Sequence, residues 1–222
     1  MINYPYITEY IRNSTPQNVG ILQELEQYAA VRHIPISQPE TLRFLEVMCA
    51  ITKPKKILEI GTAIGYSSIA MAQVSENSYI ITVEKSEDMA EIARKNIVAA
   101  GLNERIDVIT SDAADVLPTF SDNTFDLIFL DAAKGQYNRF LPHCIRVLHE
   151  GGVLISDNVL YQGTVATDEL WIKRKCTIIR NLREYIKEIM ENNQLKTSIL
   201  PLGDGVAVSY RIKDKGGAEC LS

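Results

Sequence analysis

The sequence predicts an α/β fold in which a mainly parallel sheet carries helices on both faces. Residues 56–67 read as a buried strand, a tight glycine turn and the start of a helix. Strand and helix patterns then alternate along the chain, as in a parallel sheet with crossover helices. The link at 202–205 is too short for a parallel crossover, so the last two strands should form an antiparallel hairpin.

Three helices are expected before the sheet begins. Ile21, Leu25 and Ala29 recur at helical spacing, and Pro35 and Pro39 separate the second helix from the third. The expected ranges are 3–13, 17–33 and 39–52.

Strands and helices alternate from there, because short apolar runs lie between longer segments of helical periodicity. The expected strands are 56–60, 79–84, 106–110, 126–131, 152–156, 195–200 and 205–211. The expected helices are 65–74, 87–100, 113–118, 137–148 and 172–192. We expect one domain over 1–212, with N-terminal helices (1–52) before a core (53–212), and a disordered tail at 213–222.

Composition narrows the class of protein. The 222 residues are 46% hydrophobic and 23% charged, which is typical of a soluble globular chain. We find neither an apolar run long enough for a transmembrane helix nor a secretory signal. The four cysteines lack metal or disulfide spacing, so a reducing cytoplasm is expected. A net charge of −5 gives no overall attraction to nucleic acid.

The glycine turn is the first candidate binding element. Gly61 and Gly65 would let the backbone turn sharply and approach a ligand at a helix N-terminus. Their G-x-x-x-G spacing differs from the dinucleotide pattern G-x-G-x-x-G, and a plain packing turn is the alternative.

Polar residues at the ends of later strands strengthen the case for a ligand site. Glu84 suits the two ribose hydroxyls of a nucleoside, and Asp112 with Ala113 suits an adenine edge. Asp131 and Asp157 follow the next two strands. Each acid alone could be a helix cap, but the whole series favours a binding site.

Asp131, Asp157 and Asn158 form an all-oxygen set that suits a hard divalent cation such as Mg²⁺. Lys134 lies one turn beyond Asp131, where a neighbouring dication would favour its neutral form and a general-base role. A solvated lysine that pairs with Asp131 is the equal alternative. Asp126 is expected to cap a strand start rather than bind metal.

Five motifs resemble those of the cation-dependent, S-adenosylmethionine (SAM)-dependent O-methyltransferases, the group containing catechol and caffeoyl-CoA methyltransferases. They are residues 59–67, Glu84, Asp112-Ala113, residues 131–134 and residues 157–160. Within that group, residues 7–12 and 34–40 look most like bacterial tRNA 5-hydroxyuridine methyltransferases, which make 5-methoxyuridine at the wobble position. The resemblance implies a Rossmann-like methyltransferase fold with seven strands, and a homodimer.

The resemblance also implies roles for particular residues. The SAM site would comprise Ser37, Glu59, Gly61, Gly65, Ser67, Glu84, Asp112, Ala113 and Asp131. Asp131, Asp157 and Asn158 would hold the metal, and Lys134 and Asp131 would be catalytic. Ala133 and Tyr161 replace residues associated with aromatic small-molecule pockets in the catechol and plant enzymes, which makes a phenolic substrate less certain.

Such a metal site selects acceptors with two neighbouring oxygens, and both a catechol and 5-hydroxyuracil have them. Basic residues favour the anticodon arm of a tRNA as the partner, although a solvated helix face would also explain them. The candidate RNA-binding residues are Lys53, Lys55, Lys56, Lys173, Arg174, Lys175 and Arg180. Tyr137, Tyr161 and Trp171 could stack on a splayed base or simply pack.

Three other hypotheses stay open. The main alternative is a small-molecule O-methyltransferase that acts on catechol-like or caffeoyl-CoA-like phenols. A non-catalytic nucleotide-binding protein of the same fold is the second. An NAD-dependent dehydrogenase is the poorest, because the third Rossmann glycine and a Tyr-x-x-x-Lys pair are missing.

Overall fold

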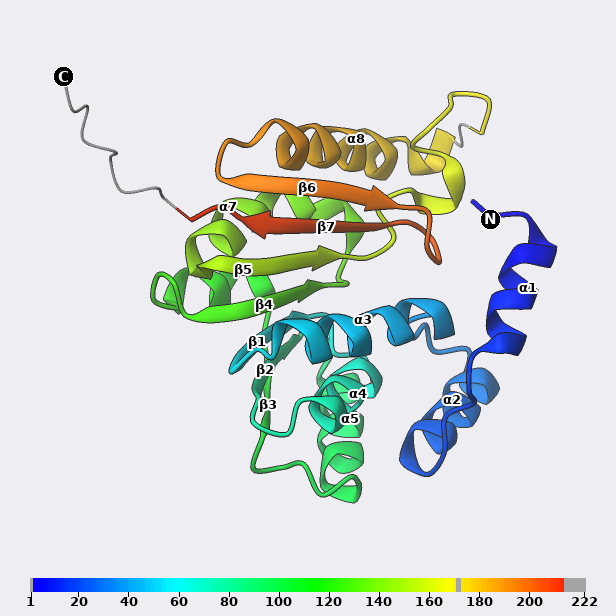
Figure 1. The fold of residues 1–222 in the computed structure, drawn as a ribbon, viewed down its shortest axis with the longest axis vertical. Coiled ribbons are helices and arrows are strands. Elements are labelled where there is room, and N and C mark those ends of the chain that lie inside the picture. Colours follow the sequence, from blue (N-terminus) through cyan, green and yellow to red (C-terminus); the bar gives the residue numbers. More distant parts are fainter. Residues whose placement is uncertain (1, 171–172, 214–222) are drawn as a thin grey trace.

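The computed structural model describes residues 2–170 and 173–213 and confirms the predicted fold class (Figure 1). Seven strands form one sheet in the order β3-β2-β1-β4-β5-β7-β6. Strands β1 to β5 pair in parallel, and β7 runs antiparallel to both β5 and β6. The strand order reverses between β1 and β4, so ligands are expected beyond the carboxyl ends of these strands.

The element bounds follow the sequence pattern closely. The strands are β1 Lys56–Ile60, β2 Tyr79–Glu84, β3 Ile106–Thr110, β4 Phe125–Leu130, β5 Leu148–Ser156, β6 Leu195–Leu200 and β7 Val206–Arg211. The first helices are α1 Pro5–Ser14, α2 Ile21–Arg32, α3 Pro39–Thr52, α4 Tyr66–Val74 and α5 Glu87–Ala99. The later helices are α6 Ala113–Val116, α7 Tyr137–Val147 and α8 Cys176–Glu191.

The largest differences from the expected ranges concern the starts of α2, α8 and β5, and α2 begins at Ile21 rather than at residue 17. Helix α8 begins at Cys176 rather than at residue 172, after the short 3-10 turn Lys173–Lys175. Strand β5 begins at Leu148 rather than at 152, and its pairing with β4 shifts register between Phe125 and Leu127. The spacing of apolar residues shows which face of a helix or strand is buried. It does not show at which residue the backbone hydrogen bonds of that element begin. The expected tail spans 213–222, and all of it after Lys213 lies outside the described residues.

Each face of the sheet carries its own apolar core. Ile57, Leu127 and Ile155 pack toward α2 to α5, whereas Leu58, Ile128 and Leu154 face α7 and α8. Figure 1 shows α3 in front of the sheet and α7 and α8 behind it. Because both faces are covered, the central strands are apolar at nearly every position.

Helix α1 is attached to the domain by polar contacts and has no buried residue. Arg12 donates to the Glu40 carboxylate at 2.8 and 2.9 Å and to Gln38 Oε1 at 2.8 Å.

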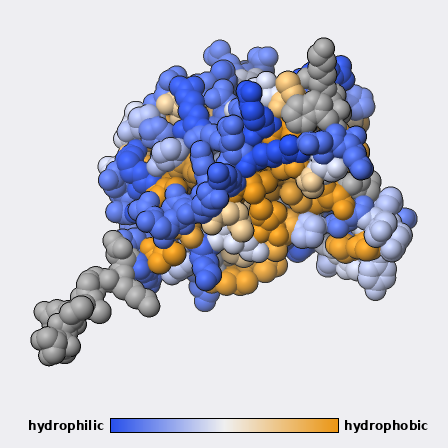
Figure 2. Space-filling view, turned by 90° about the horizontal axis from the view of Figure 1, so that it is seen from above, coloured by the Kyte–Doolittle hydropathy of each residue, from blue (hydrophilic) through white to orange (hydrophobic). Residues whose placement is uncertain are grey.

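Seen from above, hydrophobic residues gather in the middle of the molecule and hydrophilic residues lie around them (Figure 2). Within the described ranges, no helix has both the length and the apolar character needed to cross a membrane.

Candidate active site

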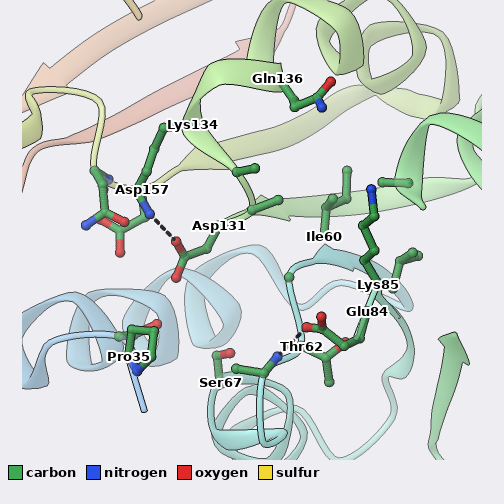
Figure 3. A pocket seen from close by; sticks show the side chains of 18 of the residues that line it. Pro35, Ile60, Thr62, Ser67, Glu84, Lys85, Asp131, Lys134, Gln136 and Asp157 are labelled. Carbon is green, nitrogen blue, oxygen red and sulfur yellow. Dashed lines mark hydrogen bonds and ion pairs between the residues drawn. The ribbon is translucent and has the colours of Figure 1, made fainter. Parts of the chain in front are cut away.

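A pocket of about 590 Å³ opens at the carboxyl ends of β1 to β5, where sequence analysis places the ligand site. Figure 3 shows Asp131, Lys134 and Asp157 grouped at one end, with Thr62, Glu84 and Lys85 at the other. Most of the predicted site residues line this one pocket. They are Ser37, Gly61, Ser67, Glu84, Asp112, Ala113, Asp131, Lys134, Asp157 and Asn158.

Two carboxylates are fixed at the end of the pocket formed by β2 and β3. Glu84 accepts the N–H groups of Ala63 at 2.9 Å and Ser86 at 2.8 Å, which ties the end of β2 to the glycine turn. Asp112 accepts the N–H of Ala114 at 2.9 Å and pairs with Lys85 at 2.8 Å. The hydrogen bond from Lys85 is the main reason that the pKa of Asp112 is lowered. Both acids therefore present ordered, charged oxygens to the pocket.

The glycine turn has a packing reason as well as a binding one. A Cβ at Gly61 would lie 2.1 Å from the carbonyl oxygen of Asp131, and the Gly61 φ of +107° is rarely adopted by L residues. Gly65 adopts a left-handed conformation just before α4. Gly61 thus lets β1 approach the end of β4, whereas Gly65 starts the helix and is not among the residues that line the pocket.

Glu59 lies beneath the pocket and does not line it. Its fully buried carboxylate accepts hydrogen bonds from Ser67, Ser68 and Thr82. Burial is the main reason that the pKa of Glu59 rises to about 7, although the three hydroxyls oppose the shift. Glu59 therefore holds the start of α4, including Ser67, against β1 and β2.

Two acids, the buried Asp157 and the half-buried Asp131, line the other end of the pocket. Asp131 follows β4 and its N–H donates to Ile60 O at 2.9 Å, while Asp157 follows β5 and its N–H donates to Leu130 O at 3.0 Å. Burial raises the pKa of Asp157 to about 8, with repulsion from Asp131 as the next cause. Burial likewise raises the pKa of Asp131. Two ionised carboxylates that lie close together away from bulk water repel each other, and a positive charge beside them would stabilise their ionised forms.

Lys134 brings one positive charge to these acids. Its Nζ lies 3.4 Å from Asp131 Oδ1, and Figure 3 shows the side chain directed toward Asp131. The lysine begins a short 3-10 turn, Lys134–Gln136, between β4 and α7. Asn158, which also lines the pocket, adopts a left-handed conformation with φ of +57°. Among the described residues no group of three His, Cys, Asp or Glu side chains forms a metal cluster, and the predicted set depends on an asparagine as its third member.

Tyr137 supports this end of the pocket from below. Its ring is fully buried, and its hydroxyl donates to Leu130 O at 3.1 Å and Asp157 O at 3.0 Å. It therefore joins the ends of β4 and β5, and the idea that Tyr137 stacks on a base is wrong. An aromatic residue at a helix start gives no sign of this role in the sequence.

We expect Tyr137→Phe to lower the free energy of unfolding by about 1–3 kcal/mol, because two buried carbonyls lose a donor. Urea denaturation followed by circular dichroism measures the change. Tyr185→Phe is the matched control, since it removes a buried hydroxyl that contacts the Ser156 side chain at 2.5 Å instead of the strand-end carbonyls. Loss of cation binding in the Tyr137 variant alone would show that joining the strand ends matters to the site. Equal stability of Tyr137→Phe and the wild type would contradict the assignment.

Asp204 is a second residue that sequence analysis misses. It lies in the turn between β6 and β7, lines the pocket, and contributes to the raised pKa of Asp157. In the sequence, Gly203-Asp204-Gly205 indicates only a turn. Its place in the site depends on pairing between strands that are distant in the chain.

The candidate RNA-binding residues occupy two separate places. Lys53, Lys55 and Lys56 lie at the amino end of β1, at the edge of the sheet opposite the pocket. These three lysines therefore do not share the surface around the pocket, and RNA binding by them stays a prediction. Asp126 Oδ2 accepts the N–H groups of Lys55 and Lys56, which confirms Asp126 as a capping residue.

Arg174 and Lys175 lie on the pocket side instead. Lys175 Nζ lies 4.8 Å from the centroid of the Tyr161 ring, and its charge acts on Asp204. Helix α8, which starts at Cys176 and carries Arg180 on its exposed side, is tied to the Lys134 turn by Asn181 Nδ2, which donates to Gly135 O at 2.8 Å. The Lys173 side chain and Trp171 lie outside the described part of the structure.

Comparison with known proteins gives a consistent result. The family model described as O-methyltransferase matches residues 13–212. A probable caffeoyl-CoA O-methyltransferase of Dictyostelium discoideum is 27% identical over 93% of this chain and 92% of its own length. A catechol O-methyltransferase of Niastella koreensis is 36% identical over 57% of this chain and 59% of its own.

The fold of this chain is also similar to that of a solved structure. The O-methyltransferase from Bacillus cereus, determined in complex with SAH, superimposes with a TM-score of 0.81 at 29% identity and covers 94% of this chain and 97% of its own. The family match begins at the end of α1 and spans α2, α3, strands β1 to β7 and every residue that lines the pocket. The chain therefore belongs to the O-methyltransferase family.

Proposed function

We propose that this protein is a SAM- and divalent-cation-dependent O-methyltransferase whose acceptor presents two neighbouring oxygens. The observation that carries the proposal is one pocket that places the ordered acids Glu84 and Asp112 at one end and the acids Asp131 and Asp157 at the other. Two different ligands can therefore meet in one cavity. Its volume of about 590 Å³ suits a cofactor and a small acceptor group.

The first end fits a nucleoside. Glu84 keeps free lone pairs for ribose hydroxyls after its two backbone hydrogen bonds, and Asp112 and Ala113 lie beside it on the next strand end. Ser67 and Gly61 line the path from there toward Asp131. SAM would lie across the switch point of the sheet, with its methionine part near Asp131.

The second end fits a hard cation. Asp131, Asp157 and Asn158 supply only oxygen donors, burial raises the pKa of both carboxyls, and repulsion from Asp131 adds to the shift at Asp157. A dication bound there would offset this repulsion. The donor chemistry therefore matches Mg²⁺ or a similar ion better than a soft metal.

When bound, SAM supplies an electrophilic methyl group, and the cation favours ionisation of the acceptor hydroxyl. The residues of this chain do the remaining work. Lys134 in its uncharged form would take the proton from the acceptor oxygen, and its Nζ lies 3.4 Å from Asp131 Oδ1, while Asp131, Asp157 and Asn158 would hold the cation. Glu59 and Tyr137 hold the two halves of the site in place.

The proposal is tested by methyl transfer from isotopically labelled SAM, measured with Mg²⁺ and with a chelator. A simple catechol and a tRNA that carries 5-hydroxyuridine serve as the two acceptors. We expect transfer with Mg²⁺ and its loss on chelation. Full activity in the chelator would contradict the cation site, and SAM binding without transfer to either acceptor would support a non-catalytic role.

The comparisons favour a catechol-like or caffeoyl-CoA-like phenol as the acceptor, because the named relatives are enzymes of those two types. Ala133 and Tyr161 are the two positions at which the sequence departs from the resemblance to the catechol and plant enzymes. Tyr66 and Phe140 are the aromatic residues among the described pocket lining. A tRNA with 5-hydroxyuridine at the wobble position is the second candidate.

One observation supports the tRNA candidate. Arg174 and Lys175 precede α8, whose first turns contact the Lys134 turn at the pocket. Phosphates of an anticodon arm could therefore reach these cations while one base enters the pocket.

We expect the triple variant Arg174→Ala/Lys175→Ala/Arg180→Ala to weaken tRNA binding and to reduce the dependence of log Kd on log salt by about 2–3, since each phosphate contact contributes about 0.7–0.9. Filter binding across a salt series measures this. Lys53→Ala/Lys55→Ala/Lys56→Ala is the matched control, because it removes the same charge at the opposite edge of the sheet. Equal losses in the two triples would refute a tRNA surface beside the pocket. Unchanged catechol turnover in both would show that the pocket itself is intact.

A homodimer also stays a prediction. Tyr6 and Tyr10 on α1 are 67% and 74% exposed, and Val47 and Ile51 on α3 are 46% and 69% exposed. Exposed apolar surface of this kind supports pairing with a second copy.

A further inference from the structure

The loop after Asp157 has an unusual backbone. Asn158, Tyr161 and Gln162 all have positive φ values, of 57°, 41° and 59°, although none of them is a glycine. Left-handed conformations in such residues carry a cost and persist only where neighbouring contacts hold them. The loop includes Asn158, which lines the pocket, and Tyr161, whose ring lies beside Lys175.

The turn between β6 and β7 supplies those contacts. Asp204 Oδ1 accepts the N–H of Gln162 at 2.5 Å, and Asp204 O accepts the N–H of Leu160 at 3.1 Å. Gly205 O accepts the N–H of Val159 at 2.9 Å. Three backbone donors of the loop region are therefore satisfied by two residues of the hairpin, and one of the acceptors is a carboxylate.

Close packing keeps the hairpin against the loop. A Cβ at Gly205 would lie 2.5 Å from Leu160 Cγ, and one at Gly203 would lie 2.5 Å from Thr41 Oγ1. The two glycines that flank Asp204 thus allow contact with the loop on one side and with α3 on the other. One carboxylate oxygen of Asp204, Oδ1, accepts a hydrogen bond from the loop, and Asp204 also lines the pocket.

We propose that Asp204 is a positioning residue that holds the loop 158–163 in its left-handed conformation and thereby shapes the acceptor side of the pocket. This role rests on the proposed function for its effect on catalysis, but the backbone contact itself does not depend on it. The carboxylate acts through Gln162 N–H, so an uncharged acceptor at the same position can replace it. Asp204→Asn retains an acceptor oxygen, and Asp204→Ala does not.

Hydrogen exchange of the full chain, read by mass spectrometry of peptides that cover 158–163, tests the contact without any acceptor. We expect Asp204→Ala to lose at least about tenfold in protection there, and Asp204→Asn to keep most of it. Asp122→Ala is the matched control, because its carboxylate pairs with Arg146 away from the pocket. Unchanged protection in Asp204→Ala would overturn the proposal.

Kinetics separate positioning from general damage. We expect Asp204→Ala to raise KM for the acceptor about tenfold or more, while Kd for SAM, measured by calorimetry, stays within about twofold of the wild type. Asp204→Asn should restore KM. A second variant, Asp204→Ala/Gln162→Gly, should recover part of the loss because glycine adopts a positive φ without support. Equal weakening of SAM and acceptor binding would overturn the positioning role, whereas an inactive wild type with normal loop protection would overturn only the proposed function.

Discussion

Asp157→Asn is expected to reduce cation-dependent methyl transfer by about 10³-fold, because it removes a charged ligand of the proposed cation. A cation at this site would stabilise the transition state by several kcal/mol. Asp157 is 2% exposed, so water cannot replace the missing carboxylate charge. The contacts that hold its backbone, from N–H to Leu130 O and from Tyr137 Oη to Asp157 O, do not involve the side chain. The fold should therefore survive the substitution.

Initial rates over a Mg²⁺ titration, together with calorimetric binding of Mg²⁺ and of SAM, measure the effect. The variant should lose affinity for the cation and keep its affinity for SAM, since the nucleoside end lies on other strands. Wild-type rates in Asp157→Asn would remove the cation from the proposed function. Rates that recover at high Mg²⁺ would instead show that Asp131 and Asn158 still bind the ion weakly.

Lys134→Met should lower kcat by about 10²–10⁴-fold, the range that a positioned general base contributes. Methionine retains much of the lysine's length and apolar stem but cannot accept a proton. The Lys134 Nζ lies 3.4 Å from Asp131 Oδ1, longer than an ideal ion pair, which leaves the amine able to reach the acceptor oxygen. Single-turnover rates with saturating SAM measure the chemical step directly.

Lys95→Met is the control, since this lysine pairs with Glu91 on the exposed side of α5. It should leave kcat unchanged. If Lys134→Met turned over as fast as the control, Lys134 would serve only as a partner for Asp131. A fall in Kd for SAM binding with no change in kcat would also contradict the base assignment.

The sequence predicts the strands well because each is a short apolar run bounded by residues that break regular structure. β1, β2, β3 and β6 begin and end where the pattern places them. The acids at the strand ends are equally visible, since a parallel sheet brings all carboxyl ends to one edge. Glu84, Asp112, Asp131 and Asp157 meet in one pocket for that reason.

Residues whose roles arise from distant pairing are harder to predict. Asp204 reaches the pocket only because β7 pairs with β5, and Tyr137 joins two strand ends that are separate in the sequence. The place of Lys53, Lys55 and Lys56 relative to the pocket is hard to predict for a related reason. Local charge clusters do not reveal which edge of the sheet they occupy, and these three precede a strand whereas the site follows it.

The place of β7 in the sheet has a consequence for how the enzyme is made. β7 is the last strand among the residues that the structure describes, yet it lies between β5 and β6 and carries the Asp204 turn at its start. A growing polypeptide cannot close its sheet until Arg211 has left the ribosome, because β6 has no other strand to pair with. Nascent or prematurely terminated chains would thus be catalytically silent and would expose the open edge of β5 to quality-control factors.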